Sequence, residues 1–314
     1  MSKLAVIAVG GNSLITDKEH KTVPDQYEAA AQTCKHMADL IEQGYDVVIT
    51  HGNGPQVGFI LRRAELASKE LHMVPLDSCG ADTQGAIGYH IQRALHNEFK
   101  ARGMDKKAAT VVTQVLVDKN DPSFKNPTKP IGSFMDKEDA EKHRKEDGWD
   151  VVEDAGRGWR RVVASPIPKK IVEFDAIENL VKSGFVVVAV GGGGIPVVED
   201  AGGILTGAAA VIDKDFASSL LARQLKADIF IISTAVEKVV LNFGKPDAKP
   251  IDKMMVSEAK KYIKEGHFKP GSMLPKVTAV IEFLEGGGNK AIITDPRNLK
   301  KAVAGETGTH VYPG

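Results

Sequence analysis

Short runs of apolar, largely β-branched residues recur along the chain, and stretches with helical periodicity lie between them. The apolar runs occupy residues 4–9, 46–50, 110–117, 185–190, 229–233 and 291–294. Most of these runs do not alternate with polar residues, which is typical of strands buried on both faces of a parallel sheet. We therefore expect an α/β fold with a central, mainly parallel sheet.

The helical patterns favour the same fold class. They cover residues 25–43, 170–182, 215–226 and 274–285, and a glycine follows the first, second and last of them within two residues. Glycine tolerates the left-handed conformation in which many helices end, so these glycines predict where the helices stop. Strands that alternate with helices in this way are typical of a sheet covered by helices.

One segment, residues 118–168, interrupts this alternation. It is rich in proline, glycine and asparagine, and residues 150–153 and 159–163 within it have strand-like patterns. Turn-forming residues at this density, together with two short strands, predict a small inserted subdomain and not a linker.

Composition and charge exclude several classes of protein. The chain has 314 residues, with 41 Lys plus Arg and 41 Asp plus Glu. Zero net charge gives no long-range basic field, so we expect neither nucleic acid nor a membrane surface as a partner. Two cysteines are too few for a disulfide framework, and without C-x-x-C or H-E-x-x-H we expect no protein metal site. The apolar run at residues 4–9 is too short for a signal peptide or a transmembrane helix, which makes the cytoplasm the expected location.

Three of the predicted strands end in glycine-rich segments, at residues 10–12, 51–54 and 191–194. Ligands of parallel sheets bind beyond the carboxyl ends of the strands, where glycines let backbone amides approach an anion closely. Tight turns explain any one of these segments, but three together favour a site for a polyanion. Neither G-x-x-x-x-G-K-[ST] nor G-x-G-x-x-G is present, which argues against a P-loop enzyme and a dinucleotide-dependent oxidoreductase.

Three lysines occupy unusual positions. Lys214 lies between Asp213 and Asp215 at a predicted helix start, Lys276 lies at another, and Lys129 lies in the inserted segment. A lysine taken alone is most often a solvated surface residue. An anion site follows only if the three converge in space, which their spacing leaves open.

Several motifs resemble those of the carbamate kinases, a family within the amino acid kinase superfamily. The motifs are V-G-G-N (9–12), H-G-N-G-P-Q-V-G (51–58), Q-G-A-I-G-Y (84–89), N-P-T-K-P-I-G (126–132), E-D-A-G-R-G-W-R-R-V-V (153–163), V-I-D-K-D (211–215) and G-H-F-K-P-G-S-M-L-P-K-V (266–277). The fourth and fifth are specific to this family, whereas the last two occur in looser form across the superfamily. One departure is T-A-V-E-K at residues 234–238, where many members have T-D-V-x-G.

The resemblance covers essentially the whole chain and implies a three-layer αβα sandwich with about eight mainly parallel strands. Residues 1–210, approximately, would form a substrate-binding lobe that carries the protruding subdomain 118–168, and residues 211–314 a nucleotide-binding lobe. The implied reaction is the reversible transfer of a phosphoryl group between ATP and carbamate, with Mg²⁺ bound to the nucleotide. The family also implies a homodimer and a role in arginine or purine-derived catabolism, where carbamoyl phosphate and ADP yield ATP.

The resemblance also implies roles for individual residues. The expected substrate-binding residues are Gly10, Gly11, Asn12, Gly52 and Asn53; the catalytic residues are Lys129, Lys214, Asp215 and Lys276; and the nucleotide contacts are Gly271, Ser272 and Met273 together with Lys214 and Lys276. Carbamate already carries an anionic oxygen, so no general base is needed to generate a nucleophile. We therefore interpret His51 as a structural or pocket-lining residue.

Two further alternatives stay open at this point. The chain could be another superfamily enzyme with a different acceptor, such as an acetylglutamate, uridylate or glutamate kinase, although the 118–168 segment argues against these. It could also be a regulatory relative that kept the fold and lost turnover. The full set of three lysines and Asp215 argues against that reading without demonstrating activity.

Overall fold

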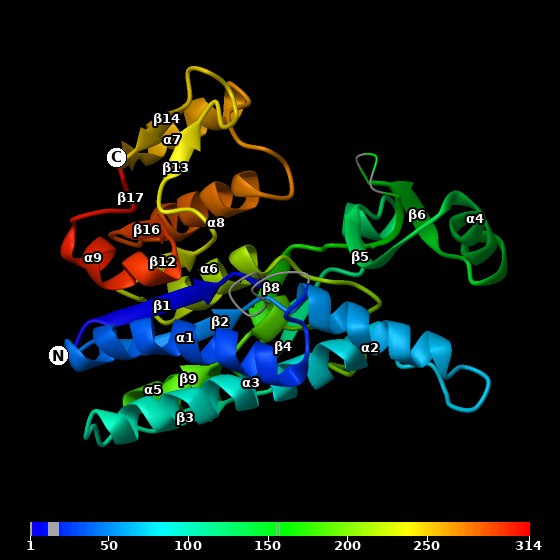
Figure 1. Cartoon of the computed structure of the whole chain (residues 1–314), viewed down its shortest axis with the longest axis horizontal. Coiled ribbons are helices and arrows are strands. Elements are labelled where there is room, and N and C mark those ends of the chain that lie inside the picture. The colour runs from blue at the N-terminus through cyan, green and yellow to red at the C-terminus, as the bar shows by residue number, and fades with distance from the viewer. Residues whose placement is uncertain (1, 12–18, 155, 157) are drawn as a thin grey trace.

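A central sheet of eight strands organises the protein, which is described here by a computed structural model covering residues 2–11, 19–154, 156 and 158–314 (Figure 1). In spatial order the strands are β15 (Lys253–Met255), β17 (Thr309–Tyr312), β16 (Ala291–Thr294), β12 (Ile229–Ser233), β1 (Leu4–Val9), β2 (Asp46–His51), β9 (Val186–Val188) and β3 (Ala108–Thr110). Neighbouring strands are parallel except β16 and β17. The prediction of a mainly parallel sheet is confirmed.

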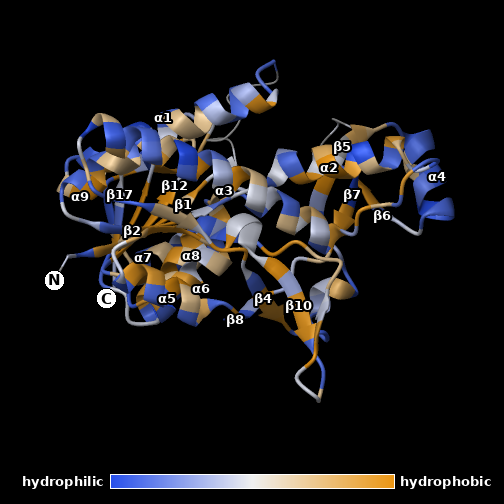
Figure 2. Ribbon diagram, turned by 90° about the horizontal axis from the view of Figure 1, so that it is seen from below, coloured by the Kyte–Doolittle hydropathy of each residue, from blue (hydrophilic) through white to orange (hydrophobic). Residues whose placement is uncertain are grey.

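Helices cover both faces of this sheet, as Figure 2 shows. One face carries α1 (Val23–Glu42), α3 (Leu76–Ala101) and α9 (Leu299–Ala304), and the other carries α5 (Phe174–Lys182), α6 (Lys214–Gln224), α7 (Val256–Lys264) and α8 (Met273–Glu285). Strand β1 is fully apolar because Ala5 and Ile7 pack into one core while Val6 and Ala8 pack into the other. The three-layer αβα architecture is therefore confirmed.

The predicted subdomain stands apart from the sandwich, beyond α2 (Gly54–Leu66) (Figure 1). It contains an antiparallel sheet in the order β5 (Lys129–Met135), β7 (Trp159–Val163) and β6 (Asp150–Glu153), with η2 (Pro122–Phe124) and α4 (Lys137–Glu146). Both strand-like segments of the sequence are strands here. Helix α2 approaches the base of the subdomain so closely that a Cβ on Gly58 would lie 3.3 Å from the Cα of Gly132.

A smaller sheet, separate from the central one, contains β11 (Leu205–Gly207), β10 (Ile195–Glu199), β4 (Gln114–Val117) and β8 (Pro168–Ile171), in that order. The remaining elements are the hairpin of β13 (Val239–Leu241) with β14 (Lys249–Ile251) and the 3-10 turns η3 (Gly191–Gly193) and η4 (Pro296–Asn298). No helix in the described ranges is both long and apolar enough to cross a membrane.

The prediction of one strand over residues 110–117 is wrong, because the run is divided between the two sheets. The backbone leaves the central sheet at Thr113, where side chains replace the ladder of hydrogen bonds. Gln84 Oε1 accepts from Thr113 N (2.7 Å), and Thr113 Oγ1 donates to Val111 O (2.7 Å). A polar residue inside an apolar run thus marks the crossing between sheets.

The helix expected over residues 170–182 begins only at Phe174. Lys170 and Ile171 belong to β8, which pairs with β4. Glu173, at the helix N-cap, accepts hydrogen bonds from the backbone and side chain of Gln114 at 2.7 and 2.8 Å. Pairing with β4 thus overrides the helical periodicity of the first residues.

Candidate active site

A cavity of about 270 Å³ lies at the carboxyl ends of β1 and β2, between the start of α6 and the base of the subdomain. The residues expected from the sequence that line it are Gly11, Gly52, Asn53, Lys129, Lys214, Asp215, Gly271 and Lys276. Asn12 lies outside the described residues. Gly10 is not part of the cavity wall; its amide donates to Ser233 O (2.9 Å) and fixes the end of β1.

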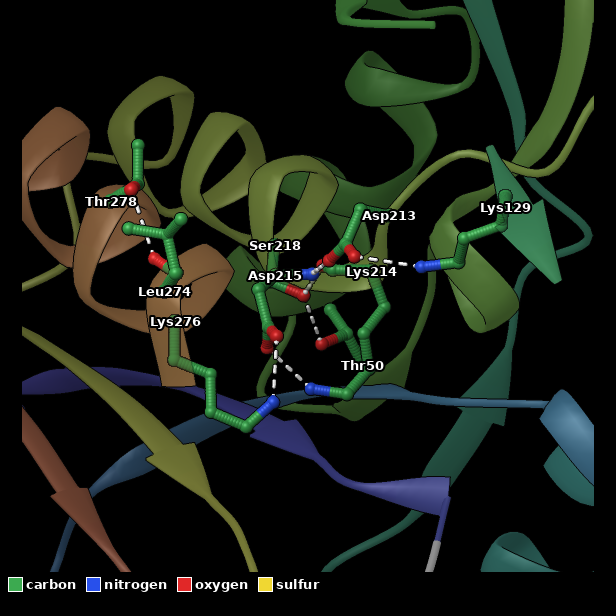
Figure 3. A network of polar contacts seen from close by, with 9 residues as sticks. All are labelled: Thr50, Lys129, Asp213, Lys214, Asp215, Ser218, Leu274, Lys276 and Thr278. Atoms are coloured by element: carbon green, nitrogen blue, oxygen red, sulfur yellow. Dashed lines mark hydrogen bonds and ion pairs between the residues drawn. The ribbon is translucent and has the colours of Figure 1, made fainter. Parts of the chain in front are cut away.

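Two lysines converge on one carboxylate at the floor of this cavity (Figure 3). Lys214 Nζ lies 2.5 Å from Asp215 Oδ1, and Lys276 Nζ lies 3.0 Å from Asp215 Oδ2. Lys214 and Asp215 belong to the first turn of α6, and Lys276 to the first turns of α8. Packing of α6 against α8 therefore brings together residues that are about sixty positions apart in the sequence.

Burial makes these charges strongly dependent on one another. Only 2% of Asp215 is exposed. Burial alone would raise the pKa of its carboxyl, but the charges of Lys214 and Lys276 outweigh that effect and lower the pKa to about 2. Burial lowers the pKa of Lys214, and the neighbouring charge of Lys276 adds to the decrease. One carboxylate thus faces two ammonium groups, an arrangement that stabilises an additional anion.

Lys129 reaches the same cavity from the subdomain (Figure 3). It is the first residue of β5, and its Nζ lies 2.8 Å from Asp213 Oδ2. Asp213 is the N-cap of α6 and accepts from Asp215 N with its other oxygen (3.0 Å). The three lysines that the sequence singled out therefore do converge in space.

Helix α6 is also fixed to the sheet beneath it. Ser218 Oγ donates to Lys214 O and lies 2.5 Å from Thr50 Oγ1 of β2, so the threonine hydroxyl is the donor in the second contact (Figure 3). Both side chains are fully buried. These bonds hold the first turn of α6 at the carboxyl end of β2.

Glycines allow the loops after β1 and β2 to pack backbone against backbone. A Cβ on Gly52 would lie 2.9 Å from Gly11 N and 3.5 Å from Lys214 Cδ. Gly52 N donates to Val9 O (2.9 Å), which keeps the two loops side by side. A larger residue at position 52 would separate the loops and displace Lys214.

The third glycine segment has a different role. Gly191 to Gly194 are all buried, and only Gly192 also lines the cavity. Gly192 has φ +68°, and a Cβ there would lie 2.1 Å from Asn53 Nδ2, which donates to Thr83 Oγ1 (3.0 Å). This segment therefore supports the Asn53 side of the cavity from behind instead of presenting a row of amides to it.

His51 is buried next to these loops, with 1% of its surface exposed. Its Nδ1 lies 3.0 Å from Gly52 O and donates to it, since a carbonyl only accepts. Burial, with a smaller contribution from Lys214, lowers the pKa of His51 to about 4. The imidazole is therefore neutral near pH 7, and the interpretation of His51 as a structural residue agrees with this geometry.

Comparison with known proteins connects this site to a family. The sequence profile of the amino acid kinase family matches residues 3–295. The chain belongs to the amino acid kinase family. It is 52% identical to the carbamate kinase-like protein YahI of Escherichia coli K12, with 99% of each chain covered. It is 54% identical to the carbamate kinase of Clostridium perfringens, with 98% of each covered.

A solved structure agrees with these relatives. The carbamate kinase of Giardia lamblia, in a structure bound to AMP-PNP, superposes with a TM-score of 0.94 at 39% identity. The alignment covers 100% of this chain and 99% of that one. The resemblance to carbamate kinases that the motifs indicate is thus confirmed over the full length.

Ser272 and Met273 do not line the cavity that holds the lysines. They line an adjoining, mainly apolar pocket of about 100 Å³ together with Val240, Phe243 and Phe268, among other residues. Gly271 lines the lysine-containing cavity and is the residue before Ser272, so this loop borders both cavities. The first cavity is thus lined by lysines and glycine-rich loops, and the second mainly by apolar side chains.

The described part of the chain contains no group of three or more His, Cys, Asp or Glu residues placed to hold a metal ion. Both carboxylates of the cavity, Asp213 and Asp215, are engaged by lysines. The donor set fits a Mg²⁺ ion held by nucleotide phosphates and water, with few ligands from the protein.

Two charged residues of the cavity wall were not predicted from the sequence as site residues, namely Asp213 and Arg160. Arg160 Nη2 donates to Gly132 O (3.2 Å), and its Nη1 lies 3.4 Å from Asp154 Oδ2. Arg160 belongs to the family-specific motif at residues 153–163, and Asp213 occupies the N-cap position before a helical pattern. Both signals were present in the sequence, but neither indicates by itself that the side chain faces a cavity.

Proposed function

We propose that this protein is a carbamate kinase, which transfers a phosphoryl group reversibly between ATP and carbamate. The observation that carries the proposal is the convergence of Lys129, Lys214 and Lys276 on one cavity in a chain whose full-length relatives include carbamate kinases. Carbamoyl phosphate is a mixed anhydride, so the reaction runs most favourably from carbamoyl phosphate and ADP toward ATP.

The proposed mechanism relies on position and charge. Phosphoryl transfer requires the attacking and leaving oxygens to lie in line and the charge on the transferred group to be offset. Lys214 and Lys276 contact oxygens of that group from the α6 and α8 side, while Asp215 keeps both ammonium groups in place. The amide of Gly11 receives the group on the opposite side, whereas that of Gly10 is engaged by Ser233 O; the resemblance gives Asn12 the same role as Gly11.

The substrate side is proposed to include Gly52, Asn53 and Lys129. Lys129 extends over the cavity from the subdomain and binds carbamoyl phosphate, which also limits access of water to this reactive anhydride. No side chain has to act as a general base because carbamate is already anionic. His51, whose pKa is lowered by burial and which does not line the cavity, is consistent with that absence of a base.

The nucleotide is proposed to bind residues 211–314, with its base in the apolar pocket at Ser272 and Met273 and its phosphates at Gly271, Lys214 and Lys276. Mg²⁺, when bound with the nucleotide, adds positive charge at the phosphates. Residues 1–210 with the 118–168 subdomain form the substrate-binding lobe in this proposal.

The test is ATP formation from ADP and carbamoyl phosphate with Mg²⁺, with acetyl phosphate as a parallel donor. Fast ATP formation selective for carbamoyl phosphate supports the proposal. Absence of turnover with tight ADP binding would instead identify a relative with another acceptor or a regulatory protein, as the name carbamate kinase-like leaves open for one of its relatives.

The homodimer, the cytoplasmic location and the role in arginine or purine-derived catabolism stay predictions from the resemblance. Light scattering tests the first directly, since each chain has a mass of 33.7 kDa. A mass of one chain at micromolar concentration would contradict the dimer.

A further inference from the structure

Asp213 connects the subdomain to the transfer site through a single carboxylate. Oδ2 lies 2.8 Å from Lys129 Nζ, and Oδ1 accepts from Asp215 N at 3.0 Å. One oxygen therefore contacts the lysine from β5, and the other caps the helix that carries Lys214 and Asp215 (Figure 3). We infer that Asp213 is a positioning residue, which holds Lys129 over the cavity for carbamoyl phosphate. This inference rests on the proposed function.

The backbone around this pair is fixed on both sides, so the contact does not depend on two flexible chains meeting by chance. Lys129 pairs with Val163 at the base of the subdomain sheet. The next residue, Ala164, forms a parallel bridge with Ala210, and its carbonyl accepts from Val211 N (2.9 Å). The base of the subdomain therefore runs beside the segment that leads to Asp213.

Asp213 orients Lys129 without consuming its capacity to bind an anion. A lysine ammonium group has three N–H donors, and the contact with Asp213 uses one of them. The remaining donors are available to oxygens of a ligand in the same cavity. Because a free lysine side chain has many rotamers, a lysine that is already held in place loses less entropy when the substrate binds.

An alternative reading is an ordinary surface ion pair with little energetic effect. The side chains of Lys129 and Asp213 are 33% and 17% exposed, so the pair is partly shielded. Asp213 also faces a cavity that is proposed to receive anions, where an unpaired carboxylate would repel the substrate. Pairing with Lys129 removes that repulsion, which a remote surface pair would not do.

The variant Asp213→Asn separates the two roles of the carboxylate. Asparagine keeps one oxygen for Asp215 N and is itself a good N-cap, so α6 keeps its first turn. Its NH₂ group then faces Lys129 Nζ, and two donors do not form a hydrogen bond. We expect KM for carbamoyl phosphate to rise about tenfold, as for the loss of a charge-assisted hydrogen bond. The Kd for ADP and the melting temperature should change little.

A matched control is Asp136→Asn, because Asp136 is also an N-cap aspartate, which caps α4 through Asp139 N (2.8 Å). It should leave KM unchanged. In a Lys129→Met background, Asp213→Asn should not raise KM further, since the contact is already lost. An unchanged KM in Asp213→Asn, or an equal increase in the Lys129→Met background, would overturn the inference and leave the proposed function intact.

A second measurement does not depend on turnover. Mass spectrometry after limited acetylation reports how fast Lys129 is modified relative to Lys182, an exposed lysine of α5. Lys129 should be acetylated severalfold faster in Asp213→Asn than in the unmodified protein, while Lys182 is unaffected. Equal rates for Lys129 would overturn the inference. If the unmodified protein forms no ATP from carbamoyl phosphate, the proposed function fails, and these rates still decide whether Asp213 holds Lys129.

Discussion

At the scale of single residues, the balance of charge around Asp215 matters most for the chemistry of the candidate active site. Its carboxylate is shared by Lys214 and Lys276 and is almost fully buried. Buried charges are stable only when they are paired, and here one anion serves two cations. A phosphate that enters the cavity completes this pairing, so the site is prepared for an anion before one arrives.

Replacement of Lys214 by methionine should decrease turnover about 100-fold or more, as for the loss of one donor to a transition-state oxygen. Methionine has a similar length and no charge, and Asp215 keeps Lys276 as a partner. The measurement is kcat for ATP formation, with melting temperature as a check on folding. Lys182→Met on the surface of α5 is the control and should behave like the unmodified protein. Near-normal turnover in Lys214→Met would remove this lysine from the mechanism.

Because of His51, the protein should lose stability as the pH is lowered from the ordinary pKa of histidine toward the lowered pKa of this residue. The folded protein takes up a proton on His51 only near pH 4, whereas the unfolded chain does so near the ordinary value of 6.5. Stability from this group is thus fully present above pH 6.5 and is lost as pH falls toward 4. His51→Asn keeps a donor for Gly52 O and does not titrate, so between pH 7 and 4.5 it should lose about 2 kcal/mol less than the unmodified protein.

Urea denaturation at several pH values measures this difference. His96→Asn, at an exposed position of α3, is the control and should keep the pH dependence of the unmodified protein. If His51→Asn shows the same pH dependence as well, His51 is not buried in its neutral form.

The individual lysines were recognisable in the sequence, but their convergence was not. Lys129 and Lys214 are 85 positions apart and meet only because β7 leaves the subdomain beside the segment before α6. No local pattern encodes that contact. Asp213 was visible as a flanking aspartate, whereas its link to Lys129 depends on the tertiary fold.

At the scale of elements, close packing behind the cavity is as important as the residues that face it. The turn η3 consists of glycines that pack against His51, Asn53 and the residue before Asp213. At Gly192 the positive φ and the nearby Asn53 amide both exclude a side chain. The conformation of this turn therefore determines where the loop after β2 lies.

Gly192→Ala should destabilise the protein by about 3 kcal/mol or more and raise KM for carbamoyl phosphate, because the new methyl group displaces Asn53. Gly184→Ala separates the effect of backbone strain from that of the clash. Gly184 also has positive φ (+82°), but no atom lies within 4 Å of a Cβ there. It should lose only about 1 to 2 kcal/mol and keep its KM. Similar losses of stability in both variants would mean that the clash with Asn53 adds nothing to the backbone strain, so that Asn53 does not need its present position.

Strands that are buried on both faces could be predicted from their apolar runs. Elements whose ends are set by contacts with other elements could not. The strands β1, β12 and β16 coincide with their apolar runs because each is buried on both faces of the sheet. The run at residues 110–117 looked equally continuous, yet Gln84 of α3 divides it through contacts with Thr113. A side chain that is 29 positions away cannot be inferred from the run itself.

At the scale of the whole molecule, the subdomain is the part whose position relative to the sandwich bears on function. Besides Lys129 at its base, it forms a second cavity of about 160 Å³ against α2, lined by Arg62 and Leu61 of α2 and by Trp149 and Arg161 of the subdomain. The Trp149 ring stacks on His143 at 4.1 Å. Any movement of the subdomain toward α2 would change the surroundings of this ring.

The tryptophans report on that movement selectively, because the chain has two and both, Trp149 and Trp159, belong to the subdomain. If the subdomain closes on carbamoyl phosphate, this ligand alone should change the intrinsic tryptophan fluorescence. ADP alone should change it little, since its proposed site in residues 211–314 contains no tryptophan. Lys129→Ala should abolish the response to carbamoyl phosphate and leave the Kd for ADP unchanged. A response to ADP alone, or an undiminished response in Lys129→Ala, would mean that the subdomain moves for a reason other than contact with the substrate.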